Sequence, residues 1–269
     1  MDAATARRYA VFPVLGIVLG IGLGALMVAG RGAGPAPADP SIIVGAPGGL
    51  DAAGAALWMD VPRPTGAAPA TCSSTDPSPL TAGQSLLERG RALRDIGLFA
   101  DLGDADDGAF LDALIGRFGA TWGSADHFDP GDPLADLMVA SLDPDRVWWR
   151  DLEADVDASN QVYAQTIGEW AAISKGAFAP TGITERWDTA QGPVHVGFTL
   201  DGVARELRPE YLYDWIDPRL IVPINALLDG SGRQLETIRG FDQTAVVLAL
   251  TPGEKAALAT GRDWCFAWP

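Results

Sequence analysis

An uncharged stretch near the N-terminus constrains this chain more than any other feature. Residues 9–30 contain no Asp, Glu, Lys or Arg and consist mainly of aliphatic residues and glycine. A helix of these 22 residues would be roughly 33 Å long. That length matches the hydrocarbon core of a bilayer, which is about 30 Å thick. The stretch therefore predicts a single transmembrane helix.

The charges around residues 9–30 predict the orientation of this helix. Arg7 and Arg8 lie directly before it, and Arg31 follows it. Positive charge tends to stay inside, so residues 1–8 are expected in the cytoplasm and the rest of the chain outside. A cleavable signal peptide is the alternative, because small residues at 33–36 would suit cleavage. Its apolar region is usually only about 7–15 residues long. Either interpretation exports the remainder of the chain.

Glycine recurs every four residues in the predicted membrane helix, at Gly16, Gly20 and Gly24. These positions form one stripe, along which two helix backbones can approach closely. The stripe indicates a helix that pairs with a partner or forms a homodimer. The alternative is that glycine is simply frequent in membrane helices.

The two cysteines agree with export. Cys72 precedes the predicted folded region, and Cys265 lies close to the C-terminus. In an oxidising compartment such a pair favours a disulfide between the two ends of the domain. Two free thiols are the alternative. The spacing fits no metal site, and we predict neither a metal nor a cofactor.

Composition divides the rest of the chain in two. Residues 31–83 are rich in Pro, Ala and Gly and predict a linker, whereas residues 84–269 predict one globular domain. The whole chain carries a net charge of −16, which disfavours nucleic acid as a partner. Lys175 and Lys255 are its only lysines, and the preference for Arg, Ala and Gly is typical of a G+C-rich bacterial genome.

The first half of the domain, residues 84–176, has helical periodicity. Helices are expected at 84–98, from Asp106 or Asp107 to 118, from 133 to about 142, from 143 to 152, and at 160–174. The helix at 143–152 is assigned from Asp143-Pro144 followed by Val147, Trp148 and Leu152.

The second half, residues 183–269, changes to strands. Segments 194–200 and 203–208 flank Asp201-Gly202, a strong type I′ hairpin signal. A helix ending near Leu228 follows, then strands at about 234–240 and 243–250, then a helix that Thr251 and Glu254 begin as a capping box. Two strand-strand-helix units result. The predicted fold is α+β, with one antiparallel sheet and its helices on one face.

Few residues suggest chemistry. No phosphate loop, nucleophile elbow or two-histidine zinc helix occurs. His127 lies near Asp129 in a Gly- and Pro-rich loop and could act with it as an acid–base pair. The second histidine, His195, lies in a predicted strand on the face opposite Val194 and Val196.

Trp148 and Trp149 are candidates for ligand binding. Adjacent residues on a helix point about 100° apart, so one of these rings could be exposed to a ligand. The alternative is that both are buried, one on the helical core and the other under the sheet.

Together these features predict a bacterial membrane-anchored, extracytoplasmic protein of the cell envelope. A non-catalytic binding or scaffold domain, with the membrane and envelope proteins as partners, is the favoured interpretation. The alternatives are an envelope hydrolase that uses carboxylates or His127, and a sensor domain for a small ligand.

Overall fold

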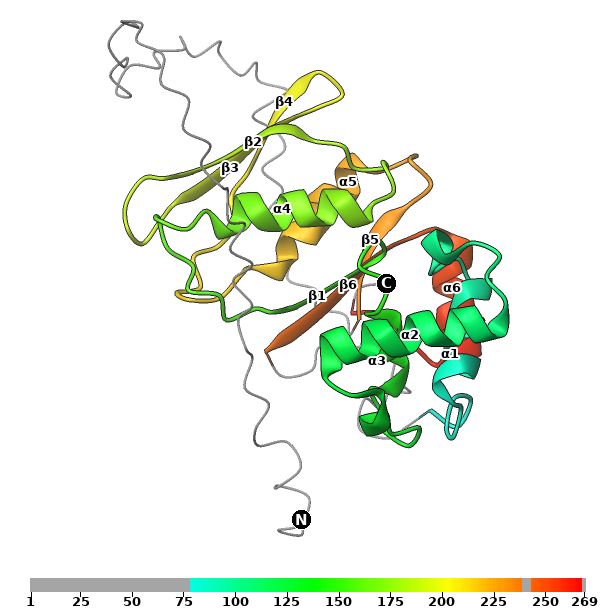
Figure 1. Ribbon diagram of the computed structural model, residues 1–269. Coiled ribbons are helices and arrows are strands. Elements are labelled where there is room, and N and C mark those ends of the chain that lie inside the picture. The colour runs from blue at the N-terminus through cyan, green and yellow to red at the C-terminus, as the bar shows by residue number, and fades with distance from the viewer. Residues whose placement is uncertain (1–77, 239–242, 268–269) are drawn as a thin grey trace, which may run out of the picture. The chain divides into compact units, whose positions relative to one another are not determined.

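The computed structural model describes residues 78–238 and 243–267 (Figure 1). The expected membrane helix, its glycine stripe, most of the linker and Cys72 lie outside these residues. No helix among the described residues has the length and apolarity needed to cross a membrane. The disulfide between Cys72 and Cys265 stays a prediction.

The described residues form an α+β fold. Its helices are α1 (Leu86–Asp95), α2 (Asp107–Trp122), α3 (Ala135–Ala140), α4 (Val162–Ile173), α5 (Ile221–Leu227) and α6 (Pro252–Arg262). Short 3-10 turns are η2 (Ala100–Leu102), η3 (Ala125–His127) and η4 (Pro218–Leu220). Its strands are β1 (Val147–Asp151), β2 (Thr181–Trp187), β3 (Val194–Leu200), β4 (Val203–Leu207), β5 (Gln234–Thr237) and β6 (Thr244–Leu250).

Local signals fix several of these boundaries. Ser85 and Glu88 form a capping box at the start of α1, and Asp106 caps α2 by accepting from the Ala109 N–H. Thr251 and Glu254 form the expected capping box of α6. Position 90 of α1 is occupied by glycine because α2 packs very close to it: a Cβ there would lie 2.4 Å from Leu114 Cδ1.

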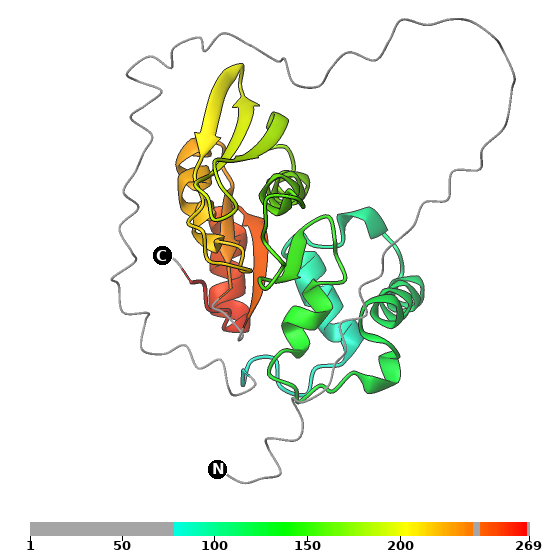
Figure 2. The same cartoon turned by 90° about the vertical axis from the view of Figure 1, so that its left-hand side faces the viewer.

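The strands form two antiparallel sheets rather than the expected single one. One sheet has the order β1-β6-β5 and the other the order β2-β3-β4. Both expected strand-strand-helix units are present, but they do not pair edge to edge. Each hairpin instead gains a strand from earlier in the chain: β2 joins β3, and β1 joins β6. Figure 2 shows the β2-β3-β4 sheet at the end away from α1–α3.

The sheet β1-β6-β5 is covered on both faces. Ala245, Val247 and Ala249 belong to a core shared with α4, α5 and the second sheet. Val246, Leu248 and Leu250 belong to a separate core shared with α1, α2, α3 and α6. Because both faces of β6 are buried, its sequence is a continuous apolar run and does not alternate between apolar and polar residues.

The expected helix at 143–152 is wrong, because Val147–Asp151 is strand β1. Alternate residues of a strand point to opposite faces, so the two tryptophans enter different cores. Trp148 packs edge-to-face on Trp170, and Trp149 packs in the same way on Trp122. A short run of bulky apolar residues does not distinguish a buried strand from a helix.

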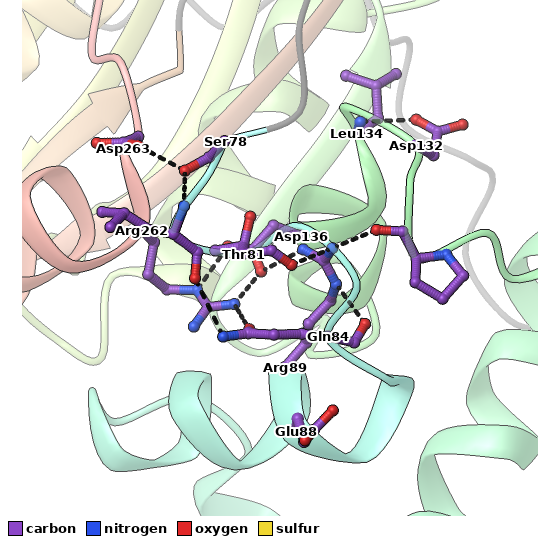
Figure 3. A network of polar contacts seen from close by, with 12 residues as sticks. Ser78, Thr81, Gln84, Glu88, Arg89, Asp132, Leu134, Asp136, Arg262 and Asp263 are labelled. Atoms are coloured by element: carbon purple, nitrogen blue, oxygen red, sulfur yellow. Dashed lines mark hydrogen bonds and ion pairs between the residues drawn. The ribbon is translucent and has the colours of Figure 1, made fainter.

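A buried ionic network joins the start of the domain to its end (Figure 3). Asp136 of α3 accepts from Arg89 Nη1 at 3.1 Å, from Arg262 Nε at 2.6 Å and from Trp264 Nε1 at 2.7 Å. Arg89 also donates to the carbonyls of Thr81 and Pro130. The network therefore connects α1, α3 and α6 with the loops beside them.

Candidate functional site

His127 and Asp129 do not form an acid–base pair. His127 is exposed at the end of η3, and its ring makes no hydrogen bond or ion pair within the part of the chain that the structure describes. Asp129 Oδ1 instead accepts from the Gly131 N–H at 2.8 Å, which closes a turn of its own loop. No cluster of three or more potential metal ligands occurs among the described residues.

His195 lies in a much more constrained environment, and the sequence predicted no role for it. It is buried on β3, opposite Arg186 of β2. Its Nδ1 lies 3.0 Å from Glu206 Oε1 and its Nε2 lies 3.1 Å from Asp188 Oδ2. Each carboxylate also forms an ion pair with an arginine, Asp188 with Arg186 and Glu206 with Arg208.

This arrangement limits what His195 can do. Each ring nitrogen already faces a carboxylate oxygen at hydrogen-bonding distance. The two contacts tie the His195 side chain to Asp188, directly after β2, and to Glu206 of β4, and they leave neither ring nitrogen open. The geometry therefore gives His195 a structural role.

The two carboxylates respond to this contact. The hydrogen bond from His195 is the largest cause of a lowered pKa at Asp188, and the hydrogen bond from Arg186 is the next. Burial raises the pKa of Glu206, but hydrogen bonds from His195 and Arg208 outweigh burial and leave that pKa below its ordinary value. Both carboxylates therefore favour the charged form in the folded state.

The pH dependence of stability follows from these directions. A carboxylate with a lower pKa in the folded than in the unfolded protein stabilises the fold at pH values above its unfolded pKa, about 4. This contribution is lost as the pH falls through the folded pKa. We expect His195→Gln to lower the melting temperature by several degrees at about pH 6. The difference from wild type should shrink as the pH falls below about 4, because the two carboxylates become protonated and their bonds to His195 no longer contribute.

His127→Gln is the matched control, because this exposed histidine has no partner among the described residues. Its melting temperature should follow wild type at every pH. A deficit in His195→Gln that does not shrink as the pH falls below about 4 would contradict the role given to the two carboxylates.

The tryptophans expected to bind a ligand contribute to packing. Trp148 is 5% exposed, and its Nε1 donates to Glu169 Oε2 at 2.7 Å. Trp149 is half-buried against the helical core. Neither ring forms an open aromatic surface, so the ligand-binding hypothesis gains no support at these positions.

An open aromatic surface does occur elsewhere, at the end of the second sheet. Tyr211 packs edge-to-face on Trp187 with ring centroids 5.8 Å apart, and Tyr213 lies 5.5 Å from Tyr211. We call Trp187, Tyr211 and Tyr213 the aromatic strip. Trp187 is half-buried, whereas Tyr213 is 73% exposed, the most exposed large hydrophobic side chain of the described residues.

The backbone holds Tyr213 outward. Its φ of 61° lies in the left-handed region, which is uncommon for a bulky residue. The Ala154 N–H donates to the Asp214 carbonyl and the Ile216 N–H to the Leu152 carbonyl, both at 2.8 Å. Strain of this kind persists only where surrounding contacts enforce it, and it often marks a functional position.

Buried contacts support the same loop from beneath. Asp217, 4% exposed, accepts from the Glu210 N–H at 3.0 Å, and its own N–H donates to the Tyr163 hydroxyl at 3.1 Å. Burial raises the pKa of Tyr163, so this hydroxyl stays neutral and remains available as a hydrogen-bonding group. The loop is therefore a preorganised platform.

Two carboxylates flank the aromatic strip. Glu185 Oε1 accepts from Trp187 Nε1 at 2.7 Å and so fixes that ring, while Asp214 is exposed beside Tyr213. Aromatic faces flanked by carboxylates can bind apolar and cationic groups. In the sequence, this site is marked only by three aromatic residues within Tyr211–Trp215. They follow no helix or strand periodicity, so the sequence did not predict a site there.

Comparison with protein-family models, with characterised proteins and with solved structures finds no match to this chain. The described residues define an α+β domain with two antiparallel three-stranded sheets.

Proposed function

We propose that this protein is a non-catalytic binding domain of the bacterial cell envelope, tethered to the membrane by residues 9–30, and that its aromatic strip contacts an envelope protein. The observation that carries this proposal is Tyr213, an aromatic side chain held 73% exposed on a braced, left-handed backbone. Exposed tyrosine on a rigid support is a frequent anchor of protein interfaces.

Two further observations favour binding over hydrolysis. Both ring nitrogens of His195 are engaged by carboxylates, and His127 has no hydrogen-bonding partner among the described residues. Hydrolysis needs a base with an available lone pair, positioned next to a nucleophile or water. Carboxylates engage both ring nitrogens of His195, and no described side chain holds the His127 ring in position beside a nucleophile.

Site-specific photocrosslinking in living cells tests the proposal. A photoreactive phenylalanine analogue at position 213 is expected to give a discrete covalent adduct with another envelope protein. The same analogue at Ile115, which is 43% exposed on α2, is the matched control and should give none. Equal adducts from both positions, or none from position 213, would contradict the assignment.

Binding should then depend on the Tyr213 side chain. Tyr213→Asn keeps a residue that tolerates a left-handed backbone, so the free energy of unfolding should change by less than about 0.5 kcal/mol. Loss of an anchor residue should weaken binding of the crosslinked partner by about 2 kcal/mol, or roughly thirtyfold. Unchanged affinity would remove the aromatic strip from the interface.

A further inference from the structure

Within the described residues, strand β4 has an open edge. It pairs with β3 through a two-residue turn at Asp201-Gly202, where both residues have positive φ (52° and 76°). In such a hairpin Leu200 and Val203 form the first hydrogen-bonded pair, so Ala204 and Glu206 direct their N–H and C=O groups away from β3. No described residue bonds to these outward groups.

The other hairpin of the fold has a covered edge. The Asn225 side chain donates to the Leu235 carbonyl and accepts from the Leu235 N–H, both at 2.8 Å, as a neighbouring strand would. The Ala267 N–H then donates to the Thr237 carbonyl at 2.7 Å. Covering of this kind prevents unwanted strand addition, and β4 lacks it within the described residues.

A second feature of β4 suggests what its edge binds. Arg205 lies opposite Phe198, so its side chain is on the core-facing side of the sheet. Arg205 Nε is buried without a hydrogen-bond partner, and the guanidinium has no ion pair with any described residue. Val203, two residues earlier on the same face, is 47% exposed. An unpaired, partly buried guanidinium is costly unless an anion joins it.

We propose that an extended segment of a partner protein adds to the β4 edge as a fourth strand of this sheet, with an acidic side chain opposite Arg205. Outward groups of Ala204 and Glu206 would supply the main-chain hydrogen bonds. Apolar side chains of the partner would lie opposite Val203 and Leu207, because alternate residues share a face. The partner segment thus has the pattern apolar–any–acidic–any–apolar. This inference goes beyond the proposed function, because it does not depend on Tyr213.

A second copy of this chain fits the edge poorly. Antiparallel pairing of two β4 strands centred on Arg205 would place two guanidinium groups opposite each other, which is repulsive. The only acid of the strand, Glu206, lies on the other face, where Arg208 and His195 already contact it. The unpaired charge therefore points to a different polypeptide.

Selection of random peptides on the full-length chain in detergent micelles tests this proposal. Enriched peptides are expected to carry the alternating pattern with a central Asp or Glu. Ala204→Pro removes one outward N–H and blocks the edge, although an edge strand tolerates proline. This substitution should weaken binding of the selected peptides by about tenfold or more, whereas Ala204→Ser, which keeps the N–H, should leave their affinity unchanged.

Arg205→Gln provides a second variant that leaves the backbone intact. Selection on it should lose the preference for a central acid. The proposal is overturned by a failure to enrich any peptide, by peptides that bind Ala204→Pro as well as wild type, or by a dimer that Ala204→Pro abolishes. Peptides lost with Tyr213→Asn but kept by Ala204→Pro would leave the aromatic strip as a binding surface and remove strand addition.

Discussion

Replacement of Asp136 by alanine is expected to lower the free energy of unfolding by about 3–5 kcal/mol, the largest effect of any single polar substitution in this domain. The reason is the number of groups that one carboxylate serves. Arg89, Arg262 and Trp264 all donate to it, and the side chains of the two arginines are 1% and 4% exposed. Its removal leaves two guanidinium groups buried without their counter-charge.

The measurement is urea denaturation at neutral pH, with Asp107→Asn as the control. Asp107 also forms an ion pair, with Arg91, but side-chain exposures of 57% and 40% place that pair in solvent. Exposed pairs contribute only about 0–1 kcal/mol. A loss below about 1 kcal/mol for Asp136→Ala would show that water or a rearranged partner replaces the carboxylate.

Trp148→Ala is expected to cost about 3–5 kcal/mol, as large aromatic truncations in a core do. Trp148 is 5% exposed, its ring centroid lies 5.6 Å from that of Trp170, and its Nε1 is bonded to Glu169. Truncation removes the packing, the ring contact and the hydrogen bond together. Trp149→Ala should cost less, because Trp149 is only half-buried.

This comparison separates packing from ligand binding at the tryptophan pair. If Trp148 lined a ligand pocket, its truncation would lower affinity for a ligand and leave unfolding nearly unchanged. Trp148→Phe keeps an aromatic ring and loses the indole N–H, so it should recover most of the stability. Thermal unfolding of the three variants under identical conditions decides between the two roles.

Elements defined by neighbouring residues were predictable from sequence. The Thr251–Glu254 capping box, the Asp106 cap and the Asp201-Gly202 turn each depend on contacts within a few positions. Strand β1 was not predictable, since what makes Trp148 a strand residue is its pairing with Val247 of β6. A local window records the apolar run but not the partner strand.

The candidate sites likewise depend on residues that are distant in sequence. Asp136 is 47 positions from Arg89 and 126 from Arg262, so no sequence pattern joins them. His127 and Asp129 are neighbours in sequence, yet each has a different local environment. Tyr213 gave a weak sequence signal, and its significance depends on the backbone that exposes it.

The proposed function requires that this domain meets its partner outside the cytoplasm. Protease treatment of intact cells, or of right-side-out membrane vesicles, tests that claim most directly, with detection through an epitope at the C-terminus. We expect the C-terminal domain to be digested without lysis, since residues 9–30 would leave it on the outer side. A domain that is protected in intact cells and digested only after lysis would contradict the claim.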